Sequence, residues 1–167
     1  MKAGKLDPID LKILGTLQRD GRLTNQRLSE QVHLSPRACL DRVRRLEAVG
    51  IITRYMAVVD PRLVVQLTIF FAEISLKDHT QRALAGFERR IRTCPEVVDC
   101  YLVSGPFDYL ARIACRDIES YRLLTEAWAD DPTLGVSRIV TNIVLHTVRE
   151  FGGYPLPDDG SPILDAG

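Results

Sequence analysis

The stretch TNQRLSEQVHLSPRACLDRVRRLEAVG, residues 24–50, decides the fold of the first third of the chain. Thr24 precedes one run of apolar residues at helical spacing, and Ser35, with the proline after it, precedes a second run. A hydroxyl side chain at such a position caps a helix, and proline suits the first helical turn. Only His33 and one leucine separate the two runs, which is the tight connection of a helix-turn-helix. The stretch therefore predicts two short helices joined by a sharp turn.

The segments on either side extend this motif. Residues 8–19 carry apolar side chains at helical spacing after Asp7 and a proline, which predicts a preceding helix. Residues 51–59 are rich in β-branched and aromatic side chains and end at Asp60, which predicts a short hairpin, or wing. Three helices followed by a β-ribbon are the outline of a winged helix-turn-helix.

The rest of the chain alternates between strand and helix patterns. The predicted order is strand, helix, strand, strand, helix, strand, over residues 68–76, 81–92, 97–103, 109–115, 118–129 and 137–148. This βαββαβ order is that of a ferredoxin-like sandwich. The predicted fold class is α+β, with a winged helix-turn-helix domain over 1–60, a linker over 61–66, a ferredoxin-like domain over 67–150 and an acidic, loose C-terminal tail over 151–167.

The charge balance hides parts of opposite sign. The 167 residues include 22 Lys or Arg and 22 Asp or Glu, so the formal net charge is zero, which excludes a uniformly basic coat protein. Residues 1–60 hold 11 basic and 7 acidic residues, a net charge of +4, whereas the tail adds Asp158, Asp159 and Asp165. The composition, 46% hydrophobic and 26% charged, is that of a globular protein. The zero total is therefore compatible with a first domain that binds nucleic acid.

Several classes of protein are disfavoured by patterns that the sequence lacks. No apolar run approaches the roughly 20 residues that span a bilayer, and the N-terminus has no signal-peptide pattern, so we expect a cytoplasmic protein without membrane contact. The cysteines at 39, 94, 100 and 115 form no CxxC pair and the histidines stand far apart, so we expect free buried thiols, no metal site and no cofactor. No nucleophile elbow, phosphate loop or paired-carboxylate pattern occurs, so we expect no enzyme activity.

The helix predicted after Ser35 has an arginine-rich exposed face. Four arginines within nine residues suit a helix in the major groove of DNA, because arginine pairs with guanine through two hydrogen bonds and also meets phosphates. Ser35 and the free amides at the helix start can bind a phosphate. The candidate DNA-binding residues are Thr24, Asn25, Ser35, Arg37, Ala38, Asp41, Arg42, Arg45 and Arg54. The alternative is that the arginines only solvate the helix, paired with Asp41 and Glu47.

The order of these motifs resembles that of the Lrp/AsnC, or feast/famine, transcriptional regulators. The resemblance covers residues 6 to 149 and rests on Leu6-Asp7, Asp10, Ile13-Leu14, Leu17, Gly21-Arg22, Leu28-Ser29, Val32, Leu34-Ser35-Pro36, Cys39, Arg42-Val43, Leu46-Glu47, Gly50-Ile51-Ile52, Tyr55, Asp60-Pro61, Ser104-Gly105-x-Phe107-Asp108-Tyr109, Leu134-Gly135-Val136, Thr141 and Ile143-Val144-Leu145. Two residues depart from the family pattern: His33 stands where glycine is usual, and Pro106 replaces an acidic residue. Histidine tolerates a left-handed backbone better than most side chains, so the turn is expected to form.

By this resemblance, the loop before Tyr109 and the last strand form a site for a small effector, an amino acid, between dimers. Gly105 permits close backbone approach, and Asp108 can accept bonds from an ammonium group or hold its own turn. The candidate effector-binding residues are Ser104, Gly105, Asp108 and Thr141. The alternative is a turn that needs no ligand. Tyr101 and Trp128 are expected in the core, because large aromatic residues mostly serve packing.

The predicted sheet leaves one face without helices. Apolar residues on both faces of strand 68–76 indicate that a partner covers the free face. We expect a homo-oligomer built from dimers that pair through their sheets, and the resemblance implies further assembly into octamers or similar rings. A dimer would hold two recognition helices at spaced half-sites on double-stranded DNA.

The sequence therefore predicts a sequence-specific DNA-binding transcriptional regulator whose assembly or DNA affinity responds to a small effector. The alternative is a small-molecule-binding module whose helical domain binds a protein partner instead of DNA, since the ferredoxin-like fold hosts many functions. A metal- or redox-responsive regulator that uses the cysteines is a third reading, from composition alone.

Overall fold

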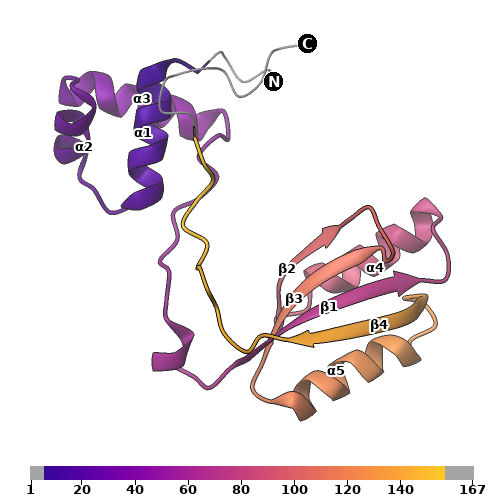
Figure 1. Cartoon of the computed structure of the whole chain (residues 1–167). Coiled ribbons are helices and arrows are strands. Elements are labelled where there is room, and N and C mark those ends of the chain that lie inside the picture. The colour runs from indigo at the N-terminus through magenta and orange to yellow at the C-terminus, as the bar shows by residue number, and fades with distance from the viewer. Residues whose placement is uncertain (1–5, 157–167) are drawn as a thin grey trace. The chain divides into compact units, whose positions relative to one another are not determined.

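The computed structural model describes residues 6–156, which form two compact units (Figure 1). The first unit contains the described residues up to Val58 together with those from Arg149 onward, and the second contains Val59–Val148. The acidic residues predicted to charge the tail, Asp158, Asp159 and Asp165, lie outside the described residues. None of the helices within residues 6–156 combines the length and the apolar character that crossing a bilayer requires.

Three helices build the first unit: α1 (Pro8–Arg19), α2 (Asn25–Val32) and α3 (Pro36–Ala48). Each starts after a side chain that accepts a backbone N–H of the first turn, and these caps are Asp7, Thr24 and Ser35. The three helices share one core, formed by Ile13, Leu28, Val32, Cys39 and Leu46. The predicted helices are confirmed, and α1 packs against α2 and α3 through this core.

The segment after α3 does not form the predicted wing. Residues 49–60 contain no strand, and the short 3-10 helix η1 (Pro61–Leu63) follows them. Ile51 packs against the helical core, and the Tyr55 hydroxyl donates to Glu47 of α3 at 2.9 Å. The apolar run has no turn within it, so it offers no second strand with which to pair. The prediction of a hairpin here is wrong.

The second unit is a four-stranded antiparallel sheet with two helices. Its elements are β1 (Thr68–Leu76), α4 (Gln81–Arg92), β2 (Val97–Leu102), β3 (Tyr109–Cys115), α5 (Ile118–Asp130) and β4 (Val136–Ile143). The strand order is β2-β3-β1-β4 with antiparallel neighbours, which is the ferredoxin-like arrangement, so the predicted α+β fold class is confirmed. β4 ends earlier than predicted, at Ile143, which pairs with Phe70 of β1.

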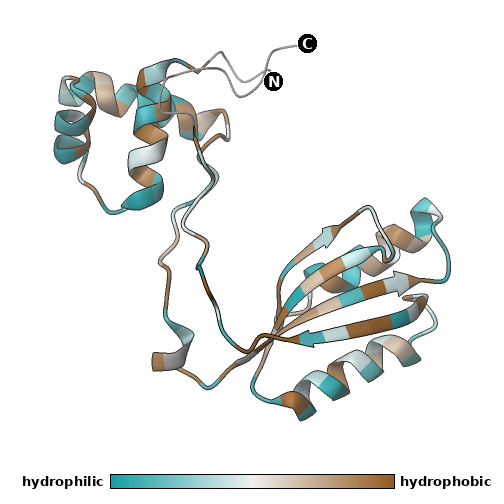
Figure 2. Ribbon diagram, in the orientation of Figure 1, coloured by the Kyte–Doolittle hydropathy of each residue, from teal (hydrophilic) through white to brown (hydrophobic). Residues whose placement is uncertain are grey.

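The two faces of this sheet differ in what covers them. One face packs against both helices, whose Phe87 and Trp128 are fully buried there, as predicted for Trp128. Within the described chain no helix covers the other face, and both hydrophobic and hydrophilic residues run along the strands (Figure 2). The uncovered face carries Phe71 and Leu110 together with Glu73 and Arg112. Tyr101 pairs with Leu110 on that uncovered face and is 54% exposed, so the prediction that Tyr101 belongs to the core is wrong.

The chain returns to the first unit after β4. The Tyr154 amide donates to Gln18 Oε1 of α1 at 2.7 Å, and Gln18 Nε2 donates to the Tyr154 carbonyl at 3.2 Å. Gly153 has a φ of +107°, and a Cβ atom there would lie 2.5 Å from Gln18 Oε1. The segment just before residue 157 is thus held on α1, and the prediction of a loose tail is wrong for this part.

Candidate nucleic-acid interface and effector loop

The turn between α2 and α3 has the geometry of a helix-turn-helix. His33 ends α2 with φ 57° and ψ 46°, in the left-handed region, and it is the one non-glycine residue with positive φ among residues 6–156. The Leu34 amide donates to the Ser29 carbonyl at 2.9 Å, which closes the end of α2. The prediction that histidine accommodates this turn is confirmed.

Three of the predicted DNA-binding residues lie at the starts of α2 and α3. The hydroxyls of Thr24 and Ser35 each accept a backbone amide of the following turn at 3.3 Å. Asn25 Nδ2 donates to the Pro36 carbonyl at 2.7 Å, so this bond joins the two helix starts. The positive ends of two helix dipoles are therefore neighbours, an arrangement that suits the phosphates of a nucleic acid.

The exposed face of α3 carries Arg37, Asp41 and Arg44, which recur at helical spacing. Arg37 is 80% exposed, and its Nε lies 3.0 Å from Oδ2 of Asp41. Arg44 is exposed and has no ion-pair partner among the described residues, although it is not among the DNA-binding residues predicted from the sequence. The i, i+7 spacing from Arg37 was the signal that could have included it. Ala38 adjoins this face, and Arg54 is exposed on the segment after α3.

Arg42 and Arg45, also predicted to contact DNA, bind two aspartates at the start of α1. Arg42 Nη1 donates to Asp7 Oδ2 at 2.6 Å and to Asp10 Oδ1 at 2.8 Å, and Arg45 donates to Asp10 as well. The Asp10 side chain is 1% exposed, so its carboxylate is buried against two guanidinium groups. Burial raises the pKa of Asp7, but the Asp10 amide and the Arg42 guanidinium outweigh burial and hold that pKa below its usual value.

We call Asp7, Asp10, Arg42 and Arg45 the α1–α3 cluster. Its two aspartates also cap the start of α1. The Asp10 amide donates to Asp7 Oδ1 at 2.8 Å, and the Asp7 amide donates to Asp10 Oδ2 at 3.2 Å, which is a capping box. The same carboxylates therefore cap α1 and hold α3. The sequence carried a sign of this in the three-residue spacing of the two aspartates. The DNA contacts predicted for Arg42 and Arg45 stay predictions, beside the structural role that the cluster gives them.

The loop between β2 and β3 is held in place by Asp108. Asp108 Oδ2 accepts the Leu76 amide at 2.7 Å, and Oδ1 lies 2.8 Å from His79 Nε2. The Asp108 amide donates to the Ile74 carbonyl at 3.0 Å, and Gly105 has a φ of +142°. Both carboxylate oxygens thus tie the loop to the end of β1 and to the β1–α4 connection, and neither closes a turn within the loop. Binding of an effector by this loop stays a prediction.

Thr141 lies apart from the rest of the predicted effector site. The loop holds Ser104, Gly105 and Asp108 close together, whereas Thr141 is on β4, with β1 between it and β3. Its Oγ1 lies 2.7 Å from the Tyr121 hydroxyl of α5, on the helix-covered face. Within one chain, Thr141 therefore does not adjoin the β2–β3 loop.

The cysteines are free thiols, and three of them are buried. Burial raises the pKa of Cys39 and Cys115, and raises that of Cys94 and Cys100 to about 11. Such thiols are protonated at neutral pH and react slowly. Across residues 6–156, no three His, Cys, Asp or Glu side chains gather so as to hold a metal ion.

Known proteins match this chain in both units. Residues 69–154 match the family model described as the Lrp/AsnC ligand binding domain, and residues 6–53 match a model described as winged helix-turn-helix DNA-binding. The transcriptional regulatory protein DoeX of Halomonas elongata is 40% identical over 145 residues, which cover 87% of this chain and 91% of DoeX. The leucine-responsive regulatory protein of Escherichia coli is 40% identical over 146 residues, which cover 87% and 88%.

Solved structures agree with these matches. A transcriptional regulator of Neisseria meningitidis, crystallised as a complex with L-Met, has a TM-score of 0.79 and 33% identity, and the alignment covers 90% of this chain and 96% of that one. An AsnC family transcriptional regulator from Agrobacterium tumefaciens has a TM-score of 0.82 and 29% identity, with 90% and 97% covered.

Proposed function

The chain belongs to the Lrp/AsnC family of transcriptional regulators, and from this premise we propose which of its surfaces bind DNA, effector and a second copy. It joins a helix-turn-helix unit for DNA binding to a ligand-binding unit, and its function is regulation of transcription in response to a small effector. The finer proposals are an amino-acid effector, assembly of copies through the sheet, and action on DNA in the cytoplasm without catalysis.

The arrangement of α2 and α3 carries the proposal for DNA. The left-handed turn at His33 sets the angle between the two helices, and the Asn25 bond aligns their starts. We place α3 in the major groove, where its exposed face meets base edges and the caps of α2 and α3 meet phosphates. The base-reading residues proposed are Arg37, Ala38, Asp41 and Arg44, and the phosphate-binding residues are Thr24, Asn25, Ser35 and Arg54. In this scheme the α1–α3 cluster holds the reading helix in position.

Fluorescence anisotropy tests this proposal with a DNA duplex from the region upstream of the gene that encodes this chain. Binding should weaken as salt rises, because phosphate contacts release counterions. Arg37→Ala should weaken binding by about ten-fold or more if it reads a base, since such contacts contribute about 1–3 kcal/mol. Arg122→Ala on α5, an arginine paired with Glu119 and Glu126, serves as the control and should leave binding unchanged.

Either of two results would contradict the DNA proposal. One is no binding of the wild-type chain to this duplex at low salt, and the other is equal losses for Arg37→Ala and the α5 control. Recovery of a stoichiometric protein partner, without DNA, would favour the protein-binding alternative.

Exposed apolar surface supports a homo-oligomer. Tyr101 on the uncovered sheet face is 54% exposed, and the segments that join the two units expose further apolar side chains, namely Val58, Leu63, Val64, Leu145 and Val148. Surfaces of this kind usually meet a partner. We propose that two copies pair through their uncovered sheet faces with two-fold symmetry, and that such dimers assemble further into rings such as octamers. Tyr101→Arg on this face should then yield monomers in light-scattering measurements.

An amino acid is the proposed effector of the second unit. It would shift the equilibrium between assemblies, and hence the spacing of the α3 helices, provided that it binds the two assemblies with different affinity. Ser104, Gly105 and Asp108 from one chain, with Thr141 from another, are the residues proposed for a shared site. A thermal-shift screen of amino acids tests this, because a ligand that binds the folded state raises the melting temperature. DNA-binding curves that no amino acid changes at millimolar concentration would contradict it.

A further inference from the structure

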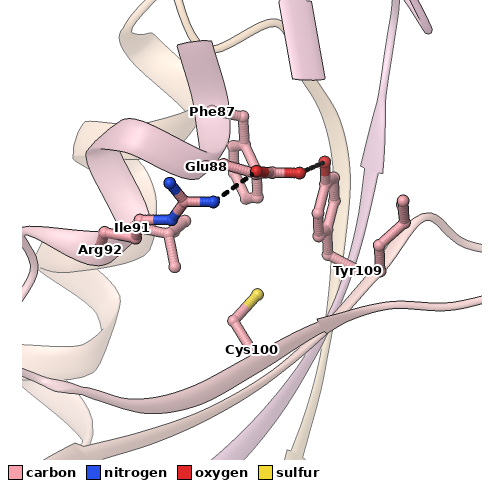
Figure 3. Close-up of a pocket in the computed structure, with 7 residues that line it drawn as sticks. Phe87, Glu88, Ile91, Arg92, Cys100 and Tyr109 are labelled. Carbon is pink, nitrogen blue, oxygen red and sulfur yellow. Dashed lines mark hydrogen bonds and ion pairs between the residues drawn. The ribbon is translucent and has the colours of Figure 1, made fainter. Parts of the chain in front are cut away.

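A hollow between α4 and β2 has no part in the sites described above. Its volume is about 250 Å³, and its walls come from α4, β2 and the first residue of β3 (Figure 3). Pockets for drug-sized ligands occupy about 300–1,000 Å³. This hollow therefore suits a smaller molecule.

The inner wall of the hollow is apolar. Phe87 and Ile91 of α4 are buried there, and the Phe87 ring packs on the Tyr109 ring with centroids 4.7 Å apart. Leu102 of β2 also lines the hollow but remains 59% exposed. An apolar group placed in the hollow would contact Phe87 and Ile91 and would shield Leu102 from water.

The polar side of the hollow carries one anion and one cation next to each other. Glu88 Oε1 accepts the Tyr109 hydroxyl at 3.3 Å, and Glu88 Oε2 lies 2.9 Å from Arg92 Nη2 (Figure 3). Arg92 is 77% exposed and uses one of its five N–H donors for this contact. Both charged groups therefore keep capacity for further hydrogen bonds.

The other two polar groups of the hollow are neutral. Burial raises the pKa of Tyr109 to about 12, with Glu88 adding to the effect, so the phenol stays a donor. Burial raises the pKa of Cys100 to about 11, so the thiol stays protonated. Glu88 and Arg92 are thus the only charges that the hollow presents to a ligand.

We propose that this hollow binds the zwitterion of an apolar α-amino acid, with the ammonium on Glu88, the carboxylate on Arg92 and the side chain against Phe87, Ile91 and Leu102. The proposal rests on the proposed function, because it assigns the same class of effector to the second unit. It differs in place: all of the hollow belongs to one chain, whereas the shared site proposed above combines Ser104, Gly105 and Asp108 of one chain with Thr141 of another.

The hollow is also connected to the β2–β3 loop. Leu102 ends β2 and pairs with Tyr109, the first residue of β3, so this pair flanks the loop. Asp108, which holds the loop, directly precedes Tyr109. A ligand in the proposed pose contacts Leu102, one member of this pair. Its binding can change the loop only if the ligand has different affinity for two arrangements of that residue.

Isothermal titration calorimetry on the full chain tests the proposal with L-leucine, L-methionine and L-valine. Each ligand is compared with analogues that lack one charge: for leucine, leucinamide and 4-methylpentanoate. We expect one bound amino acid per chain and at least a ten-fold loss of affinity for either analogue, because each loses a charge-assisted contact. Glu88→Gln and Arg92→Gln should each cost about ten-fold for the same reason, and Leu102→Trp should block binding by filling the hollow.

Glu126→Gln is the matched control, since it breaks the ion pair with Arg122 one turn away on α5, which has no part in the hollow. Circular dichroism establishes that each variant is folded. The hollow would be overturned as the site by wild-type affinity in Glu88→Gln, Arg92→Gln and Leu102→Trp together with loss of binding in Ser104→Trp. That result would leave the proposed function intact. Absence of heat with L-leucine, L-methionine and L-valine on the wild-type chain would overturn the hollow as a site for apolar amino acids, and the thermal-shift screen decides the proposed function separately.

Discussion

Replacing Asp10 by alanine should destabilise the first unit more than any change on its surface. The variant removes the carboxylate that accepts hydrogen bonds from Arg42, Arg45 and the Asp7 amide. Removing one partner of a fully buried ion pair costs about 3–5 kcal/mol. Arg42 and Arg45 keep 29% and 46% of their side-chain exposure, so water partly replaces the lost partner. We therefore expect a loss of about 2–3 kcal/mol in the free energy of unfolding.

Amide hydrogen exchange followed by mass spectrometry separates this effect from the second unit. Peptides of α1 and α3 should lose protection equivalent to that free energy, because their shared contacts are gone. Trp128, the only tryptophan, lies in the core of the second unit, so its fluorescence transition in urea should not move.

Asp41→Ala provides the comparison, since it breaks the exposed α3 pair with Arg37 and should cost no more than about 0.5 kcal/mol. A loss below about 0.5 kcal/mol for Asp10→Ala as well would refute the reasoning that the cluster holds α3 on α1.

Four further changes have defined outcomes. His33→Gly should stabilise the chain by about 1 kcal/mol in urea denaturation, because glycine takes the left-handed conformation without strain. The pKa of Asp7 lies below its ordinary 3.8 in the fold, so Asp7 stabilises the folded state fully above that value, and this stabilisation is lost as pH falls through the folded pKa. Unfolding curves of Asp7→Asn between about pH 5 and pH 1 should lack this loss of stability. Gly153→Ala should release the segment held by Gln18 and speed its cleavage in limited proteolysis, while the α1 peptides keep their protection. Arg54→Ala should lower the salt slope of DNA binding by about 1, because that side chain is proposed to meet a phosphate, as anisotropy titrations would measure.

Local signals in the sequence were sufficient for most of the secondary structure. α1, α2 and α3 begin at caps whose side chains were recognisable, and the bounds of β1 and α4 follow apolar periodicity that burial then satisfies. The tight turn was predictable because the two flanking helices leave only two residues for the connection, whereas the left-handed backbone at His33 followed from the family resemblance, in which glycine is usual there.

Contacts between distant segments could not be read in the same way. The arginine-rich face of α3 divides into two sets, because Arg42 and Arg45 turn toward Asp7 and Asp10 more than 30 positions earlier. The i, i+7 spacing from Arg37 sets Arg44 on the exposed face, but no local pattern shows that Arg42 and Arg45 meet two aspartates of α1. Likewise, Thr141 and the β2–β3 loop have separate places because strand order, rather than sequence distance, determines which residues meet.

The predictions of a wing and of a buried Tyr101 were wrong for a related reason. A β-rich run forms a strand only where a partner strand exists, and residues 49–60 have none in the described chain. Tyr101 looked like a core residue by its size, but its register opposite Leu110 places it on the uncovered face. Size and hydropathy predict burial only after the pairing is known.

In the proposed function, this chain binds DNA through α3 and an amino acid changes this binding. Both parts are measured by an anisotropy titration of the wild-type chain on the duplex from upstream of its own gene, across a salt series, with and without each amino acid. The affinity should fall steeply and linearly with salt on logarithmic axes, and at least one amino acid should shift the curve. Absence of binding at low salt, or curves that no amino acid moves, would contradict the proposed function.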